Sequence, residues 1–245
     1  MKQSYKSLND VRLLRRHAPR NDTNTKEQII INYNAMTNRF KYLILFIIIA
    51  AAMWIEMFVL KNYNFWIEML IAGSLLALSS AYINHRTGPA INFRLYCFKP
   101  SYLIIGIFSA AILYFIFYAG DYISKQILDF ADKQVTGIYG NKVLLDPIVI
   151  GLLLFFIIGP AEEIFWRGFI QDTLAEKFGD NAGWIIGALI YGGVHIFALN
   201  FMLFMAALIC GLFWGYMFKR YKSLWPGIIS HAVWDLTIFV LMPVR

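Results

Sequence analysis

The residues of this chain that could exchange protons lie where charged side chains are costly. Two adjacent carboxylates, Glu162 and Glu163, interrupt a long apolar stretch, and two of the four histidines, His195 and His231, lie inside other apolar stretches. An ionisable side chain inside a membrane span costs about 2.5–3.5 kcal/mol on insertion scales. Each of these residues therefore needs a structural or a functional reason.

The spacing around the two glutamates predicts different roles for them. Glu163 and Arg167 are four residues apart with the acid first, which is the better order for an ion pair on a helix. Glu162 points about 100° away around the same helix. We therefore expect Glu163 to be neutralised and structural, and Glu162 to be free for proton chemistry.

The sequence before the carboxylates predicts the start of a helix. Pro160 fits the first turn of a helix, so we expect a new helix to begin there. The positive end of that helix would favour the two carboxylates. The alternative is a doubly charged helix end at the membrane surface, which is disfavoured because apolar sequence resumes at Phe169.

The two apolar histidines each have a partner at helical spacing. His231 and Asp235 are four residues apart, so the carboxylate can accept a hydrogen bond from the imidazole. Tyr191 and His195 have the same spacing. A lone intramembrane histidine often serves only as a hydrogen-bonding group between helices. Two of them, with acids in neighbouring stretches, favour a shared polar site.

The composition indicates that this site is embedded in a membrane protein. Of 245 residues, 59% are hydrophobic and only 15% are charged, and the mean hydropathy is +0.57. An ordinary soluble domain has about 25% charged residues. Soluble, disordered and nucleic-acid-binding classes are therefore excluded. Cys97 and Cys210 form neither a disulfide framework nor a metal knuckle.

The predicted fold class is an all-α polytopic membrane protein with about seven transmembrane helices. A span needs about 20 apolar residues. The stretches cover residues 42–60, 65–83, 102–119, 148 to beyond Pro160, 184–199, 201–218 and 227–240. The acids and histidines named above all lie in the last four stretches, so the active site is expected between these helices.

Basic residues predict how the chain is oriented in the membrane. If the N-terminus is cytoplasmic, 17 lysines and arginines lie in the inner segments and 5 in the outer ones. Cytoplasmic segments carry the excess of basic residues in membrane proteins. We therefore expect a multi-pass protein with a cytoplasmic N-terminus. The inner segments would be residues 1–41, 84–100, 167–183 and 219–225.

Three regions follow from these patterns. Residues 1–40 form a basic cytoplasmic segment with affinity for anionic lipid. Residues 41–144 hold the N-terminal transmembrane helices and an external amphipathic segment, and residues 145–245 form a helical core that carries the chemistry. Within residues 120–146, an interfacial amphipathic helix is predicted from apolar residues at helical spacing, namely Ile123, Ile127, Phe130 and Ala131.

Three motifs follow one another on three apolar helices: Glu162-Glu163-x-x-x-Arg167, Tyr191-x-x-x-His195 and His231-x-x-x-Asp235. This ordered trio resembles the CPBP family of intramembrane proteases, which includes the CaaX prenyl endopeptidases and the bacterial Abi proteins. The resemblance covers roughly residues 145–240. The chain departs from the family pattern at two positions, with Tyr191 in place of phenylalanine and Asp235 in place of asparagine.

The resemblance implies an intramembrane endopeptidase in which six residues form the site. In the implied mechanism, Glu162, helped by His195, deprotonates a water that attacks the scissile carbonyl. His231 donates to the oxyanion, and Arg167 fixes the helix through Glu163. An ionised Asp235 would repel an oxyanion, so its expected role is to orient His231, unless it is protonated or holds a metal.

Metal chemistry is the alternative route. Four of these side chains would suffice for zinc in ligand type and number, namely Glu162, His195, His231 and Asp235. The chain has no H-E-x-x-H helix to preset such a site. The resemblance favours a glutamate-driven, metal-independent route, so no cofactor is the first expectation and zinc is the alternative.

The expected partners are the lipid bilayer and a membrane-associated protein or peptide substrate, with no nucleic acid. The cluster is expected to open toward the cytoplasm, because the fourth span runs from outside to inside. The preferred setting is a prokaryotic plasma membrane. A prenylated tail, a precursor peptide and a sorting tail all remain open as substrates, and so does the oligomeric state. The rival class is a non-catalytic transporter, immunity or scaffold protein that uses the same buried polar cluster.

Overall fold

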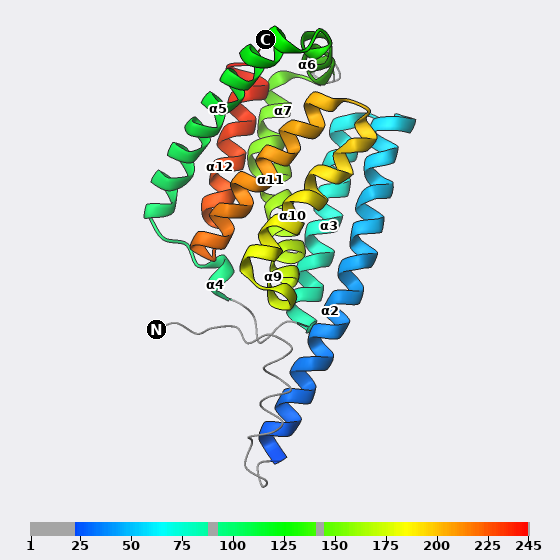
Figure 1. Ribbon diagram of the computed structural model, residues 1–245, viewed down its shortest axis with the longest axis vertical. Helices are drawn as coiled ribbons and strands as arrows, with labels where there is room; N and C mark the ends of the chain where they lie inside the picture. Colours follow the sequence, from blue (N-terminus) through cyan, green and yellow to red (C-terminus); the bar gives the residue numbers. More distant parts are fainter. Residues whose placement is uncertain (1–22, 88–92, 141–144, 245) are drawn as a thin grey trace.

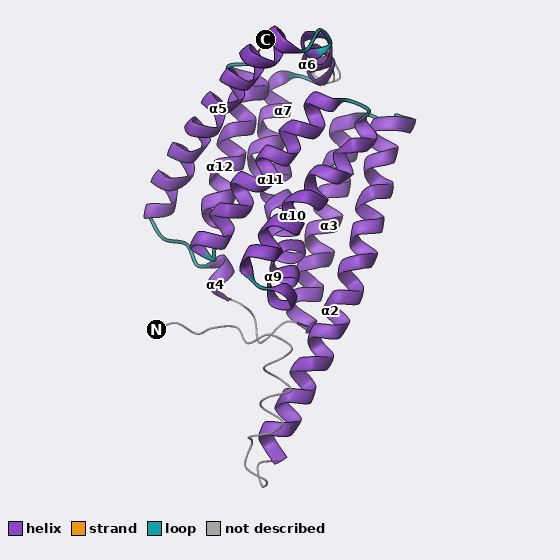
Figure 2. Cartoon of the chain, in the orientation of Figure 1, coloured by secondary structure: helices purple, strands orange, loops and turns teal. Residues whose placement is uncertain are grey.

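The computed structural model describes residues 23–87, 93–140 and 145–244, which form a bundle of helices. Loops and turns make up the rest of these ranges, and no strand occurs in them (Figure 2). The all-α polytopic fold predicted from the sequence is confirmed. The first 22 residues of the predicted basic segment lie outside the described residues.

The helices follow one another along the bundle with short connections (Figure 1). Their bounds are α2 Thr23–Ile55, α3 Phe65–Thr87, α4 Phe93–Tyr96, α5 Ser101–Ile127, α6 Ala131–Tyr139, α7 Pro147–Leu153, α8 Gly159–Phe165, α9 Asp172–Phe178, α10 Asp180–Val194, α11 Phe201–Tyr221 and α12 Trp225–Asp235. Wider π-helical turns join or extend several of them, namely η1 Glu56–Leu60, η3 Leu154–Ile158, η4 Trp166–Gln171 and η6 Leu236–Leu241, and a 3₁₀ turn, η5 His195–Ala198, follows α10.

Six apolar helical runs in the described ranges are long enough to cross a membrane, and a seventh is shorter. The six are Asn38–Leu60, Phe65–Thr87, Ser101–Ile127, Pro147–Phe178, Asp180–Ala198 and Phe201–Tyr221, and the shorter one is Trp225–Leu241. At about 1.5 Å per residue the last run falls slightly short of a full hydrocarbon thickness. The seven predicted stretches therefore correspond to seven helical runs.

Pro160 lies in the first turn of α8, as predicted, but α8 continues a longer helical run and does not start a separate helix. The run Pro147–Phe178 is helical throughout its 32 residues. The π-helical turn η3 ends just before the proline, and the amide of Gly159 donates to the carbonyl of Leu154, five residues back. This wider turn accommodates a residue that has no amide hydrogen without ending the helix. Because the helix continues, no free helix N-terminus faces Glu162 and Glu163.

The amphipathic helix expected within residues 120–146 is divided in two. The helix α5 continues to Ile127, and its last turns leave Ile123 and Ile127 exposed. Leu128 is extended and ends α5, and α6 begins at Ala131, which is fully buried. The apolar residues at helical spacing thus lie on both sides of the turn between α5 and α6, and the spacing alone does not reveal this turn. The helix α6 lies across one end of the bundle (Figure 1).

A buried charged group joins three helices at the other end of the bundle. Arg39 of α2 contacts Asp172 at 2.9 Å and Glu176 at 2.6 Å, both on α9. Its Nε donates to Asn84 of α3 at 3.1 Å, and the amide of Asn84 donates to the carbonyl of Gly168 at 2.9 Å. We call Arg39, Asn84, Asp172 and Glu176 the Arg39 clamp. It holds α2 and α3 against the helical run that carries the two adjacent glutamates.

Candidate active site

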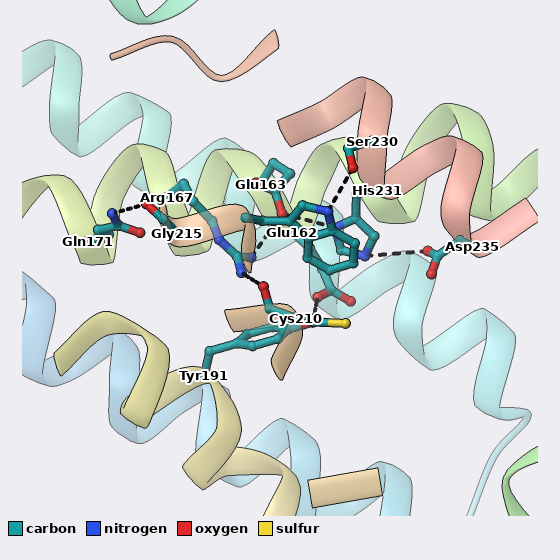
Figure 3. Close-up of polar contacts among 11 residues, drawn as sticks. Glu162, Glu163, Arg167, Gln171, Tyr191, Cys210, Gly215, Ser230, His231 and Asp235 are labelled. Carbon is teal, nitrogen blue, oxygen red and sulfur yellow. Dashed lines mark hydrogen bonds and ion pairs between the residues drawn. The ribbon is translucent and has the colours of Figure 1, made fainter. Parts of the chain in front are cut away.

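Side chains from two helical runs meet in the middle of the bundle (Figure 3). The run Pro147–Phe178 supplies the two glutamates and the arginine of the first motif, and α12 supplies the histidine and aspartate of the third. All five side chains are buried. We call this group the Glu162 cluster, which consists of Glu162, Glu163, Arg167, His231 and Asp235.

Glu163 is the most heavily paired acid of the Glu162 cluster. Its Oε1 accepts from Arg167 Nη1 at 2.9 Å, so the predicted ion pair is present. The same oxygen lies 3.0 Å from His231 Nδ1, a contact that the sequence did not predict. Gly227 of α12 leaves room for this carboxylate, because a Cβ atom there would lie 2.6 Å from Glu163 Oε2. Glu163 is thus a structural acid that joins α8 to α12.

Arg167 lies in the π-helical turn η4 and fixes this turn against α10 and α11. Its Nη2 donates to the carbonyl of Cys210 at 3.3 Å. Its guanidinium lies 4.7 Å from the ring centre of Tyr191 and 5.5 Å from that of Trp214, within the range of cation–π attraction. One turn further, the amide of Gln171 donates to the carbonyl of Gly215 at 2.8 Å. The charge of Arg167 is therefore enclosed by a carboxylate, a carbonyl and two aromatic rings.

His231 lies between two carboxylates. Its Nδ1 faces Glu163, and its Nε2 lies 3.5 Å from Asp235 Oδ2, so the predicted His231–Asp235 pair is the longer of its two contacts. The indole of Trp214 stacks on the imidazole, with ring centres 3.7 Å apart and planes 18° from parallel. Trp214 is held in turn by a hydrogen bond from its Nε1 to Ser230 Oγ at 3.1 Å. The ring plane of His231 is thus fixed on both edges and on one face.

Glu162 has a different kind of partner. The hydroxyl of Tyr191 donates to its Oε2 at 2.9 Å. The backbone carbonyl of Tyr191 lies 2.8 Å from His195 Nδ1. A carbonyl can only accept, so Nδ1 carries the proton and Nε2 is the nitrogen left for exchange. Among the described residues, no direct hydrogen bond joins Glu162 to His195, and Tyr191 stands between them in the network.

Some of the predicted site residues line a cavity, and the others are buried outside its lining. A cavity of about 610 Å³ is lined by Glu162, Tyr191, His195, His231 and Asp235 among its polar residues. Most of its other walls are aromatic and aliphatic, including Trp54, Trp66 and Trp234. Glu163 and Arg167 do not border it. A molecule bound in the cavity would therefore contact one carboxylate and two imidazoles. The Glu163–Arg167 ion pair packs outside the cavity lining.

The region around this cavity matches a known family. Residues 144–237 match the family model described as type II CAAX prenyl endopeptidase Rce1-like. This region belongs to the CPBP/CAAX protease family. No curated protein and no solved structure matches the chain.

The donor set of this CPBP core does not fit a metal site. Within the part of the chain that the structure describes, no three His, Cys, Asp or Glu side chains come together as metal ligands do. Both nitrogens of His231 already face carboxylates, and Nδ1 of His195 is used by a carbonyl. A zinc site built from the four residues named as alternative ligands would require these contacts to be rearranged.

The cavity of the CPBP core opens at the end of the bundle where α6 lies. We call its outermost polar lining the cavity mouth, formed by Lys61, Asp121, Ser124, Tyr139 and Asn200. The helices α4 and α9 lie at the other end (Figure 1). The opening of the cluster toward the cytoplasm stays a prediction. Glu162 lies near the middle of its 32-residue run, so the direction of the run does not decide where the cavity opens.

Two important residues of the CPBP core were not predicted in their actual roles. Tyr191 was noted only as the aromatic residue of its motif, although a tyrosine in place of phenylalanine adds one buried hydroxyl that needs a partner. Gly227 was not singled out at all. Its closeness to Glu163 depends on how α12 packs against α8, which the sequence does not reveal.

Proposed function

We propose that this protein is an intramembrane endopeptidase that hydrolyses a peptide bond of a membrane-associated protein or peptide with water activated by Glu162. The proposal is carried by the pairing of the three buried carboxylates. Glu163 faces Arg167 and His231, and Asp235 faces His231. Glu162 borders the cavity, and its partner in the described structure is a neutral hydroxyl.

Glu162 acts as the general base in this proposal, and His195 assists it. A water held between the Glu162 carboxylate and Nε2 of His195 gives up a proton to Glu162 as its oxygen attacks the scissile carbonyl. Tyr191 is a positioning residue, because its hydroxyl holds the carboxylate and its carbonyl sets the tautomer of His195. The proton taken up by Glu162 then passes to the leaving amine.

His231 stabilises the developing oxyanion in this proposal. Its Nδ1 is held by Glu163 at 3.0 Å, whereas Nε2 lies 3.5 Å from Asp235, so the Nε2–H of the fixed ring is available to a closer acceptor in the cavity. A preorganised donor of this kind stabilises charge that appears only in the transition state. Asp235 and the stacked Trp214 keep the ring in place, and Asp235 does not contact the substrate in this scheme.

Hydrolysis without a metal is part of the same proposal, and it is supported by the contacts that already occupy His231 and His195. Purified protein should keep its cleavage activity after exhaustive chelation, with no metal detected at the level of one per chain. Activity that disappears on chelation and returns with zinc would overturn this part. The plasma membrane, with the N-terminus in the cytoplasm, is the proposed location.

The experiment is a comparison of protein termini in cells that express the wild-type chain or Glu162→Gln. The variant removes the ionisable group and keeps the acceptor oxygen for Tyr191. New termini that are present with the wild type and absent with Glu162→Gln would support the protease. The matched control is Glu176→Gln in the Arg39 clamp, which should leave those termini unchanged. A pattern that is the same with Glu162→Gln, at equal expression and membrane insertion, would overturn the proposal in favour of a non-catalytic protein.

A further inference from the structure

A groove on the side of the bundle separates α5 from α11. The helix α5 packs along α12 and makes little direct contact with α11. The groove between α5 and α11 has a volume of about 510 Å³, and its apolar walls include Ile105 of α5 and Phe213 and Met217 of α11. Among the described residues, Ile209 alone lines both this groove and the central cavity. An unfilled groove would forfeit dispersion contacts along both walls, so an apolar occupant is favoured there.

The length of the groove matches one leaflet of a bilayer. It extends along α11 from Ile209 to Arg220. At about 1.5 Å per residue this stretch of helix is about 16 Å long. The hydrocarbon core of a bilayer is about 30 Å thick, so the groove spans about half of it. These dimensions suit the acyl chain of a single lipid.

Two basic side chains lie at one end of the groove, on either side of a pair of tyrosines. The rings of Tyr102, in the first turn of α5, and Tyr221, at the end of α11, have centres 6.1 Å apart. Lys99 Nζ lies 5.8 Å from the ring centre of Tyr102, and the guanidinium of Arg220 lies 5.8 Å from that of Tyr221. Both distances are within the range of cation–π attraction. The aromatic pair therefore places one cation from each wall at this end of the groove.

These two cations differ from a basic neighbour in having no acidic partner. In the described ranges, neither Lys99 nor Arg220 forms an ion pair with a carboxylate, whereas Lys222 pairs with Asp180. Both side chains are exposed. Arginine binds phosphate oxygens through paired hydrogen bonds, and basic pockets between membrane helices bind anionic head groups. The end of the groove thus complements an anion, and its walls complement a hydrocarbon chain.

We infer that the groove between α5 and α11 binds one anionic phospholipid of the bilayer, with an acyl chain along the apolar walls and the phosphate at Lys99 and Arg220. This site lies outside the proposed catalytic cavity and does not depend on the protease function. A zwitterionic phospholipid would offer the same chain and phosphate but would add a cation beside two cations. The site therefore selects lipids by the charge of the head group.

The first test measures lipid binding to the purified full-length protein by native mass spectrometry. Phosphatidylglycerol and phosphatidylcholine with the same acyl chains are compared, and we expect the anionic lipid to bind several-fold more tightly. Arg220→Gln should weaken its binding about fivefold, and the double variant with Lys99→Gln more than tenfold, because each basic residue near a lipid surface contributes about a factor of five. Arg86→Gln, at an exposed position on α3, is the matched control and should stay within about twofold of the wild type.

Three results of the first test would overturn the inference. Equal weakening by Arg220→Gln and Arg86→Gln would show only a general attraction of lipid to basic residues. Displacement of the bound lipid by soluble glycerol phosphate would assign the cations to a free phosphate. A dimer that excludes the lipid in the same spectra would assign the groove to a second copy of the chain.

The second test locates the acyl chain. Phosphatidylglycerol with a photoreactive group in its tail is crosslinked to the protein in lipid discs, and the crosslinked peptides are mapped. Crosslinks should fall on residues 209–217 of α11 and beside Ile105 of α5. Ile105→Trp narrows the groove and should lower them several-fold, whereas Ile104→Trp, at an exposed position outside the groove, should not. Crosslinks spread evenly around the bundle, or unchanged by Ile105→Trp, would overturn the inference.

Discussion

One helical run contributes carboxylates to two groups of charged side chains, and the two groups differ in how those carboxylates are paired. The run Pro147–Phe178 supplies two carboxylates to the Arg39 clamp and two to the Glu162 cluster. In the clamp, both carboxylates contact Arg39. In the Glu162 cluster, Arg167 and His231 face Glu163, and Glu162 is left with the hydroxyl of Tyr191.

The surroundings of the two groups differ as well. None of the clamp residues borders the cavity, whereas Glu162, His231 and Asp235 all do. Each group holds a buried cation, Arg39 in the clamp and Arg167 in the Glu162 cluster, so a buried charge alone does not distinguish the site. A carboxylate without a cationic partner in the described structure, facing a cavity that a guest can reach, is what distinguishes Glu162 from Asp172 and Glu176.

Among variants that keep Glu162 itself, the largest effect is expected for Gly227→Ala, which would disturb the Glu162 cluster and leave the clamp untouched. The new Cβ atom would lie 2.6 Å from Glu163 Oε2, so the carboxylate or α12 must shift. Misplacement of a catalytic group by about 1 Å can cost about 10²-fold in rate. Cleavage per folded molecule should fall by about that factor. Gly140→Ala, at a position with nothing within 4 Å and outside the cavity lining, is the control, and equal activity of both variants would contradict the assigned packing.

Tyr191→Phe tests whether the partner of Glu162 matters to its chemistry. The change removes only the hydroxyl, and one hydrogen bond of about 1.4 kcal/mol corresponds to a tenfold change in rate. We expect kcat/KM to fall about tenfold. An unchanged kcat/KM in the correctly inserted variant would show that Tyr191 only packs.

Asp235→Asn should have a smaller effect. The residue faces His231 at 3.5 Å and, in the proposed scheme, only orients the ring, a task that an amide oxygen can also perform. We expect cleavage to fall by no more than a few-fold at neutral pH. Complete loss of cleavage by correctly inserted protein would instead indicate that Asp235 transfers a proton or binds a metal.

Arg39→Gln should have the smallest effect on cleavage and a large effect on stability. The change leaves Asp172 and Glu176 without their shared cation, and breaking a buried ion pair costs about 3–5 kcal/mol. The unfolding midpoint in detergent should fall clearly, while the rate per folded molecule stays within about twofold, since no clamp residue lines the cavity. Arg86→Gln, at an exposed position at the same end, is the control. A catalytic defect in folded Arg39→Gln would contradict the assignment of a purely structural role to the Arg39 clamp.

The features that could be predicted from the sequence are those that one helix determines alone. The length of the apolar stretches predicts the spans. A spacing of four residues predicts the Glu163–Arg167 and His231–Asp235 pairs, because the two residues of each pair lie on the same helix. The resemblance added the order of the motifs, and the match over residues 144–237 agrees with that family.

The features that could not be predicted depend on how helices rotate and pack against each other. The contact of Glu163 with His231 joins residues 68 positions apart, and that of Arg39 with Asp172 joins residues 133 apart. The π-helical turn before Pro160 was missed for a local reason, because proline usually limits a helix and the sequence does not show where a wider turn absorbs it. The side on which the cavity opens follows from all the helices together.

The most direct test of the claim that Glu162 is the base is a rate comparison between Glu162→Gln and Glu176→Gln. Both are purified in lipid discs and assayed on a peptide that spans a cleavage site found by the termini comparison. We predict that Glu162→Gln lowers kcat by about 10²–10⁴-fold, the usual contribution of a general base, and that Glu176→Gln leaves it unchanged. Comparable rates for the two folded variants would contradict the assignment of Glu162.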